Sequence, residues 1–327
     1  MSLFPLRLIP HTTNFNFMRV RWVSIGIAAL LAIAAIGAIV VKNFNFALDF
    51  TGGTVVELRF QTPPNVDGVR ERLEAGGYGS AQVQTFGTGS DLLVRLQPRE
   101  DAGTAAGAEA SDRTAQDVLR LASSEGNQAT VMRSEFVGPQ VGKELALNGL
   151  YTLLFVVVGF LIYIAVRFEW KFAVSAIVTT LADVLIVAGF FAFSGIEFDL
   201  TILAGLLSVM GFSINDKIVV FDRVRENLRK YRKMDMISLL DLSTNETLSR
   251  TVMTSLTVLM ALMALLLIGP GVIFGFTAAM TLGLFVGCYS SIYMANPILV
   301  WLGVGPHSFV PQQTEADKAE AKLKEGL

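Results

Sequence analysis

Two carboxylates and one arginine in the long apolar runs of this sequence are the residues most able to carry chemistry. Asp216 lies in the run LTILAGLLSVMGFSINDKIVV, Arg250 stands at the start of the next run, and Asp183 lies in the run before. An ionised side chain at the centre of a membrane costs about 3 kcal/mol, so such residues usually turn toward other helices and serve ion or proton transfer. Lys217 directly follows Asp216, so a structural ion pair between these two is the alternative.

A buried carboxylate and an arginine on neighbouring antiparallel helices suit reversible protonation. The proton affinity of the carboxyl group depends on its burial and on the distance to the arginine, so a movement of the helices shifts it. Asp216 and Arg250 therefore form a candidate proton path, with Asp183 and Asn215 as further candidates. Two alternatives stay open: Arg250 anchors a helix end at the membrane surface, and Asp183 only joins helices by hydrogen bonds.

Small and polar residues recur every three or four positions in two of these runs. Such a stripe predicts a face along which another helix packs closely. In the run that contains Asp216, the stripe consists of Gly205, Ser208, Gly211 and Asn215. In the next run, it consists of Thr247, Arg250, Thr254 and Thr257. The second stripe predicts that Arg250 faces the helix bundle rather than lipid.

The sequence lacks the usual signatures of an enzyme. No Walker A, GxSxG, HExxH or CxxC motif occurs. The only cysteine, Cys288, cannot form an internal disulfide, and the two histidines, His11 and His307, lie near opposite ends of the chain. We therefore expect no catalytic residue, no metal site and no cofactor. A net charge of −2 also argues against a nucleic-acid partner, because nucleic-acid-binding domains are usually basic.

The apolar runs predict a multi-pass α-helical membrane protein. Hydrophobic residues make up 52% of the sequence and charged residues only 17%, below the roughly 25% usual in soluble domains. A helix of about 20 apolar residues crosses a bilayer. Six runs are close to this length or longer, and the predicted transmembrane spans are 22–41, 146–166, 172–194, 200–221, 251–269 and 274–302.

Basic residues between the spans predict the orientation. They occur in the N-terminal segment 1–21, between the second and third spans, in a predicted loop at 222–249 and in the tail 304–327. All four segments share one side if the chain crosses six times, and the positive-inside rule places that side in the cytoplasm. The prediction is a membrane protein with both termini cytoplasmic and with helices two to six within residues 141–303.

Residues 42–140, between the first two spans, then lie outside the cytoplasm and predict a small folded domain. Alternating and helical patterns there predict strands at 54–60, 81–86, 91–96 and 129–136, and helices at 66–75 and 114–123. The order β-α-β-β-α-β is that of an α+β ferredoxin-like domain. Small polar residues at 99–110 predict a flexible linker within it.

Several longer motifs are distinctive in combination. They include LDFTGGTVVELRF (48–60), EFVGPQVGKEL (135–145), RFEWK (167–171), GFSINDKIVVFDRVREN (211–227), TLSRT, TSLTVLM and SSIYMANP. Over residues 15–303 the sequence resembles the SecD/SecF family of protein-export membrane proteins, in particular its SecF members, within the resistance-nodulation-division (RND) superfamily. The resemblance implies half of an RND-type bundle in the bacterial inner membrane, with the domain at 42–140 in the periplasm. Gly52 and Gly53 match a turn of the family, where glycine permits a tight backbone bend. Ala182 stands where SecF proteins often have histidine, which weakens the case for proton transfer by Asp183.

The resemblance also implies a function and partners. It implies a non-enzymatic subunit of the Sec translocon that uses the proton-motive force for late steps of protein translocation, with Asp216 and Arg250 on the proton path. The implied partners are SecD, the SecYEG channel and YajC, with YidC as a further candidate, besides membrane lipids and translocating precursor polypeptides. One alternative is a half-size RND-type transporter of small apolar molecules or lipids, which would need a large apolar pocket in the outer domain. Another is a scaffold in which Asp216 and Arg250 only hold helices together.

Overall fold

The computed structural model describes residues 13–79, 81–86, 89–96, 107–124 and 126–305. Two compact units emerge from its contacts. The helix unit comprises Met1–Asn43, Val156–Ser194 and Ala204–Leu327, and the sheet unit comprises Phe44–Phe155 and Gly195–Leu203. Each unit is described by itself.

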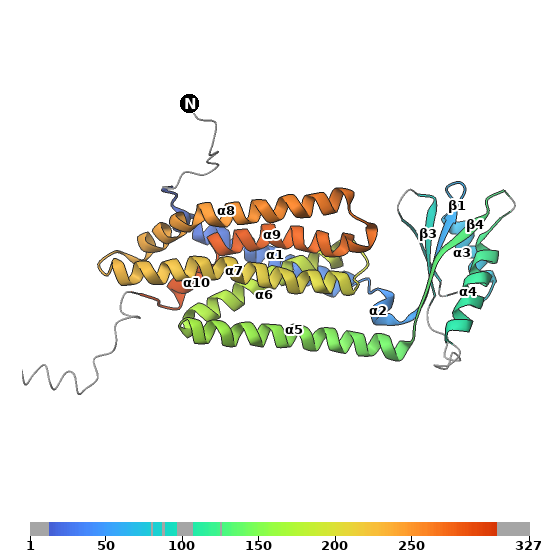
Figure 1. Cartoon of the computed structure of the whole chain (residues 1–327), viewed down its shortest axis with the longest axis horizontal. Coiled ribbons are helices and arrows are strands. Elements are labelled where there is room, and N and C mark those ends of the chain that lie inside the picture. The colour runs from blue at the N-terminus through green and yellow to red at the C-terminus, as the bar shows by residue number, and fades with distance from the viewer. Residues whose placement is uncertain (1–12, 80, 87–88, 97–106, 125, 306–327) are drawn as a thin grey trace, which may run out of the picture. The chain divides into compact units, whose positions relative to one another are not determined.

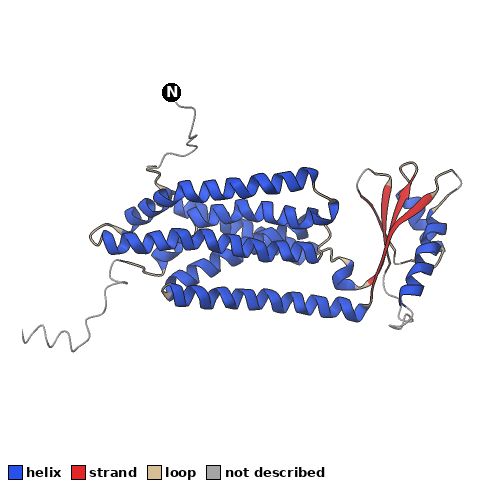
Figure 2. Ribbon diagram, in the orientation of Figure 1, coloured by secondary structure: helices blue, strands red, loops and turns tan. Residues whose placement is uncertain are grey.

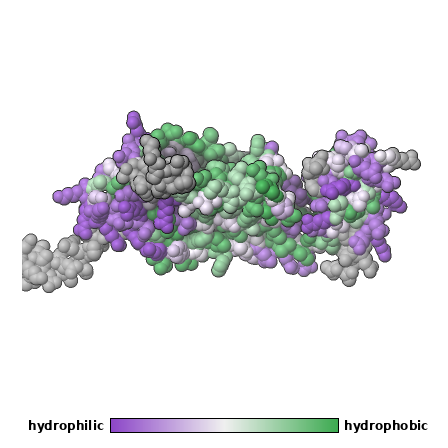
Figure 3. All heavy atoms as spheres, turned by 45° about the horizontal axis from the view of Figure 1, so that its top comes forward, coloured by the Kyte–Doolittle hydropathy of each residue, from purple (hydrophilic) through white to green (hydrophobic). Residues whose placement is uncertain are grey.

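Among the described residues, six helical segments are long and apolar enough to cross a membrane, which confirms the predicted multi-pass architecture (Figure 1). The long helices are α1 (Arg21–Lys42), α5 (Pro139–Arg167), α6 (Trp170–Ser194), α7 (Leu200–Lys230), α8 (Met236–Ile268) and α9 (Phe274–Tyr293). Shorter helices are η1 (Phe17–Val20), α2 (Leu48–Thr51), α3 (Val66–Ala75), α4 (Gly107–Ala122), η2 (Gly271–Ile273) and α10 (Ala295–Trp301). Figure 2 shows that helices make up nearly the whole of the long bundle. Figure 3 shows a largely hydrophobic surface over much of that bundle, as lipid contact requires.

The predicted basic loop at 222–249 is wrong, because most of it is helix. α7 continues to Lys230 and α8 starts at Met236, so only a short turn separates them. The helix continues because Val224 and Leu228 are buried on its core-facing side, while Arg225 pairs with Asp222 one turn earlier at 2.8 Å. The charged residues of this stretch therefore lie on the surface side of a helix and not in a loop.

The turn between α7 and α8 ends at a side-chain cap. The Asp235 carboxylate accepts hydrogen bonds from the backbone N–H groups of Ile237 and Ser238, which satisfies two free donors at the start of α8. This cap explains why α8 begins some 15 residues before the predicted span at 251–269.

The sixth span is interrupted, whereas the sequence predicted one helix at 274–302. α9 ends at Tyr293 and α10 begins at Ala295. Pro297 explains the break, because proline has no N–H and its ring clashes with the carbonyl four residues earlier.

Small residues allow close helix contacts inside the helix unit. A Cβ atom added at Gly283 of α9 would lie 2.1 Å from a methyl group of Val209 on α7, and one added at Gly189 of α6 would lie 2.3 Å from the Cβ of Ala35 on α1. A second group of contacts is a cluster of buried apolar side chains that includes Phe172. The close α7–α9 approach holds the polar residues of these two helices next to each other.

The sheet unit confirms the predicted ferredoxin-like order. Its strands are β1 (Gly53–Phe60), β2 (Gln82–Phe86), β3 (Asp91–Leu96) and β4 (Ala129–Val137). They form one antiparallel sheet in the order β2-β3-β1-β4. The helices α3 and α4 lie on one face of this sheet (Figure 1). Their apolar residues pack there around Val56, Leu58 and Val94.

The linker predicted at 99–110 falls partly outside the described residues, since 97–106 are not among them. Residues 107–110 belong to α4, so the helix starts seven positions before the predicted 114. Alanine and glutamate are good helix formers, which explains why the small residues GAEA continue the helix rather than the linker.

Candidate functional site

Asp216 lies in the middle of α7 and is almost fully buried, with 2% of its surface exposed. In the described part of the chain, no cationic side chain lies within 4 Å of its carboxylate. Its closest polar side-chain contact is weak: the Cys288 thiol lies 4.0 Å from Oδ2. Asp216 is therefore a buried carboxylate without an ion-pair partner of its own among the described residues.

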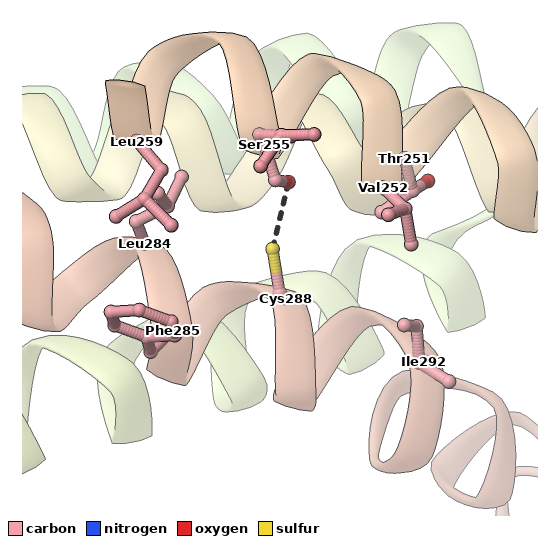
Figure 4. Close-up of a pocket in the computed structure, with 9 residues that line it drawn as sticks. Thr251, Val252, Ser255, Leu259, Leu284, Phe285, Cys288 and Ile292 are labelled. Carbon is pink, nitrogen blue, oxygen red and sulfur yellow. Dashed lines mark hydrogen bonds between the residues drawn. The ribbon is translucent and has the colours of Figure 1, made fainter. Parts of the chain in front are cut away.

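Cys288 connects Asp216 to α8. The Cys288 sulfur lies 2.8 Å from the Ser255 hydroxyl, and Figure 4 shows these two side chains pointing toward each other between α9 and α8. The same two residues line a pocket of about 200 Å³ whose other walls are mostly apolar. The pocket wall is completed by Thr251, Val252, Leu256, Leu259, Leu284, Phe285 and Ile292.

Asp183 of α6 has the opposite environment. Its Oδ2 accepts hydrogen bonds from the Ser213 hydroxyl at 2.6 Å, the Ser290 hydroxyl at 2.7 Å and the Lys217 ammonium at 2.8 Å. The side chains of Asp183 and Lys217 are both completely buried. We call Asp183, Lys217, Ser213 and Ser290 the lysine cluster; it joins α6, α7 and α9.

The lysine cluster corrects one expectation from the sequence. Lys217 follows Asp216 in the chain, but its ammonium pairs with Asp183 and not with Asp216. Successive residues of a helix point about 100° apart, so adjacency in sequence does not place two side chains together.

Arg250 does not contact Asp216. Its residue is exposed on α8, and within the described ranges its side chain forms no ion pair. The expectation that Arg250 turns toward the bundle is therefore wrong for this chain by itself. Thr254 and Thr257, on the same stripe, are exposed as well, while Thr247 is buried.

The pairing of α7 with α8 gives the relative level of the two residues. Arg223 pairs with Glu246 at 2.6 Å, and the Asn227 amide donates to the Ser243 hydroxyl at 3.0 Å. This antiparallel register puts Asp216 opposite residues 253 and 254, one helical turn beyond Arg250. A shift of one turn would bring the two residues level.

The stripe predicted on α7 splits between two faces. Gly205 packs inside the helix unit, where an added Cβ would lie 2.8 Å from the Cβ of Ala279 on α9. Asn215 is exposed, and an added Cβ at Gly211 would meet nothing within 4 Å. Ser208 is partly exposed, and its hydroxyl only donates back to the Ala204 carbonyl at 2.9 Å. Ser208, Gly211 and Asn215 thus lie on an open small-residue face next to Asp216.

Gly52 and Gly53 have a backbone role in the sheet unit. Their φ angles are +68° and +125°, values that side-chain-bearing residues rarely adopt. A Cβ at Gly53 would lie 2.3 Å from the Leu96 carbonyl oxygen, and one at Gly142 would lie 2.9 Å from the Gly52 nitrogen. The glycine pair thus lets β1 start against β3.

The sequence missed four residues of these environments. Ser213, Ser290, Ser255 and Cys288 form the polar contacts around the two carboxylates, yet each is a small uncharged side chain within an apolar run. One signal was available: Ser213 precedes Lys217 by four residues, the spacing of side chains on one helix face. Among the described residues, no group of His, Cys, Asp and Glu could hold a metal ion.

Comparisons with known proteins reveal the family. A family model described as "Protein export membrane protein SecD/SecF, C-terminal" matches residues 118–305, more than half of the chain, and a model described as "SecD/SecF GG Motif" matches residues 37–64. A protein translocase subunit SecF of Pseudomonas aeruginosa is 43% identical over 302 residues, which cover 92% of this chain and 96% of that protein. The chain belongs to the SecF family.

Other SecF proteins and two solved structures agree. The protein translocase subunit SecF of Vibrio alginolyticus is 41% identical over 315 residues, which cover 96% of this chain and 98% of that protein. A crystal structure of SecDF, a translocon-associated membrane protein from Thermus thermophilus, matches with a TM-score of 0.81 and 39% identity over 92% of this chain. SecDF in a super-membrane-facing form matches with a TM-score of 0.66 and 37% identity over 98% of this chain. This SecF-family chain spans about two-fifths of each SecDF chain, 40% and 41%.

Proposed function

We propose that this SecF-family chain is an auxiliary subunit of the Sec translocon that works with SecD and uses the proton-motive force to drive late steps of protein translocation. Relatives named protein translocase subunits cover nearly the whole chain, and the matching SecDF is described as translocon-associated. In this proposal the chain lies in the bacterial inner membrane with both termini in the cytoplasm, and it is not an enzyme.

The observation that carries the proposal is the environment of Asp216. A carboxylate in a membrane-spanning helix normally needs a cation or several donors, and Asp216 has neither among the described residues. Such a group gains from binding a proton and can release it when the surroundings change. In this proposal the Asp216 carboxylate binds a proton from one side of the membrane. After the helices move, it releases the proton to the other side and becomes a carboxylate again.

Arg250 supplies the change of surroundings in this proposal. Its guanidinium lies one turn from the level of Asp216, so sliding of α8 along α7 brings the two charges together and favours release of the proton. Asn215 lies beside Asp216 on the open face and is a candidate to hold water on the path.

The open face also supports SecD as partner. Ser208, Gly211 and Asn215 leave room for a close helix, and exposed Arg250 is costly in lipid, so a second set of helices has reason to cover this side. The SecDF chains are longer than this one and leave room for such a set. The SecYEG channel, YajC and YidC enter the proposal as wider partners through the family resemblance alone.

The transporter alternative has less support. Two larger hollows, of about 410 and 560 Å³, lie beside Phe17 and Tyr293 and beside the charged residues 229–233. The apolar pocket between α8 and α9 measures about 200 Å³, below the roughly 300–1,000 Å³ of typical small-molecule sites. It lies in the helix unit, whereas that alternative called for a large pocket in the outer domain.

The test replaces Asp216 by Asn in cells depleted of the native protein, followed by pulse-chase of a secreted precursor. We expect the variant to reach the membrane and to co-purify with SecD, while precursor maturation stalls. The matched control is Asp222→Asn, which removes an exposed carboxylate from the same helix. Normal maturation with D216N would reject the proton role and leave the scaffold hypothesis.

A further inference from the structure

The lysine cluster holds the only fully buried cation that the structure shows within the described spans. The Lys217 side chain has no exposed surface, and its ammonium lies 2.8 Å from Asp183 Oδ2. Ser213 and Ser290 donate to the same oxygen, so that oxygen is held from α7 and α9 as well. Asp183, on α6, is therefore fixed from both neighbouring helices.

Lys217 would otherwise be a partner for Asp216. Apart from Asp183, Asp216 is the one carboxylate that is buried within the described spans, and the two residues are neighbours in the chain. A lysine side chain is long and flexible, and a buried ammonium strongly prefers a carboxylate. A lysine salt bridge to Asp216 would keep that carboxylate charged and resist the binding of a proton.

We propose that Asp183 is a positioning residue that bonds the Lys217 ammonium between α6, α7 and α9, so that the ammonium forms no salt bridge with Asp216, and Asp216 stays free to bind a proton. In this role Asp183 acts only through the ammonium that it holds. This inference rests on the proposed role of Asp216. It gives Asp183 a role that is neither helix packing alone nor proton transfer.

The first test measures whether Lys217 can move to Asp216. Thermal unfolding midpoints of the purified full chain are compared for the wild type, D183N, D216N and the double variant D183N/D216N. We expect a modest drop for D183N, little change for D216N, and a drop for the double variant that clearly exceeds the sum of the two, because the ammonium then has no carboxylate left. Additive drops would overturn the inference, since Lys217 would gain nothing from Asp216.

The second test measures function. Export driven by an imposed proton gradient is followed in inverted membrane vesicles that contain D183N, normalised to the amount of the protein and of co-purified SecD. We expect D183N to lose the gradient-dependent part of export, and D183N/K217M to regain it, because the displaced cation is gone. The matched control is D183N/K171M, which removes a lysine at the exposed end of α6 and restores nothing.

The outcomes separate this inference from the proposed function. If D183N/K217M remains as defective as D183N, Asp183 acts directly and the positioning role is overturned. If D183N exports normally, that role is also overturned. If D216N itself exports normally, the proposed proton role fails, while the unfolding midpoints still decide whether Asp183 keeps Lys217 from Asp216.

Discussion

The two buried carboxylates of the helix unit lie on neighbouring helices and have contrasting surroundings. Asp183 has a lysine and two hydroxyl groups within 2.8 Å of one oxygen, whereas Asp216 has a thiol at 4.0 Å. A carboxylate that accepts a salt bridge and two hydrogen bonds has its charge stabilised and fixes helices, but it cannot easily change its protonation. A carboxylate without them is costly to keep charged. The difference supports the proposal in which the first carboxylate is structural and the second exchanges protons.

The largest expected effect breaks the Asp183 side of this comparison. Lys217→Met leaves the Asp183 carboxylate buried with hydroxyl donors only, and loss of one partner of a buried ion pair costs about 3–5 kcal/mol. Asp216→Asn removes a charge that has no partner, so its cost stays below about 1 kcal/mol. Denaturant unfolding in micelles measures both, and equal costs would show that the two surroundings do not differ.

A smaller effect is expected from the hydroxyl groups of the lysine cluster. Ser213→Ala or Ser290→Ala removes one hydrogen bond to a charged group, worth about 1.5–3 kcal/mol. Ser208→Ala is the control, because its hydroxyl only donates to its own helix at the Ala204 carbonyl. The same unfolding measurement applies, and a loss no larger than that of Ser208→Ala would contradict the assignment.

A smaller effect again is expected at Cys288. Cys288→Ser keeps a polar group next to Ser255 and Asp216, so the unfolding free energy changes by less than about 1 kcal/mol. Cys288→Leu fills the pocket between α8 and α9 and lies against Asp216, so gradient-driven export should fall more than stability does. Equal export by the two variants in vesicles would show that protons do not reach Asp216 through this pocket.

The smallest effect concerns a third carboxylate, in the sheet unit. Arg59 on β1 donates to Asp91 on β3 at 2.8 Å, and this hydrogen bond holds the pKa of Asp91 below its usual value. A lowered carboxyl pKa stabilises the fold at neutral pH, and that contribution disappears as the pH falls below about 4 through the lowered value. Arg59 is largely exposed, so the contribution is small.

Hydrogen–deuterium exchange of peptides covering β1 and β3 tests this weak pair. At neutral pH, Asp91→Asn should exchange faster than wild type, and the difference should shrink as the pH falls below about 4. Glu57→Gln, on the same strand as Arg59, is the control. A difference that does not shrink on acidification would mean that Asp91 stabilises the strands by something other than its charge.

The apolar and alternating patterns were enough to predict the six spans and the order of strands and helices along the sheet unit, because each depends on local periodicity. These patterns failed at the end of α7, where a charged stretch predicts a loop but forms a helix. Arg225 and Asp222 pair there along the helix surface. Pro297 is a local indication of the break after α9, but it lies in an apolar run that is long enough for one continuous helix.

The sequence could also select Asp216 as the unusual carboxylate, but it could not assign Lys217. Which of two carboxylates a lysine reaches depends on how α6, α7 and α9 are packed, and that packing depends on close contacts such as the one between Gly283 and Val209. No single run of sequence contains this information. The same limit explains why Arg250 was expected to face the bundle.

The most direct test of the whole account compares the two carboxylates in one assay. Inverted vesicles with equal amounts of D216N or D183N/K217M are given the same imposed proton gradient, and export of a precursor is timed. The account predicts no gradient-dependent export with D216N, and near-normal export with D183N/K217M, which lacks the whole buried ion pair. The opposite result, export with D216N but none with D183N/K217M, would contradict it and transfer the proton role to Asp183.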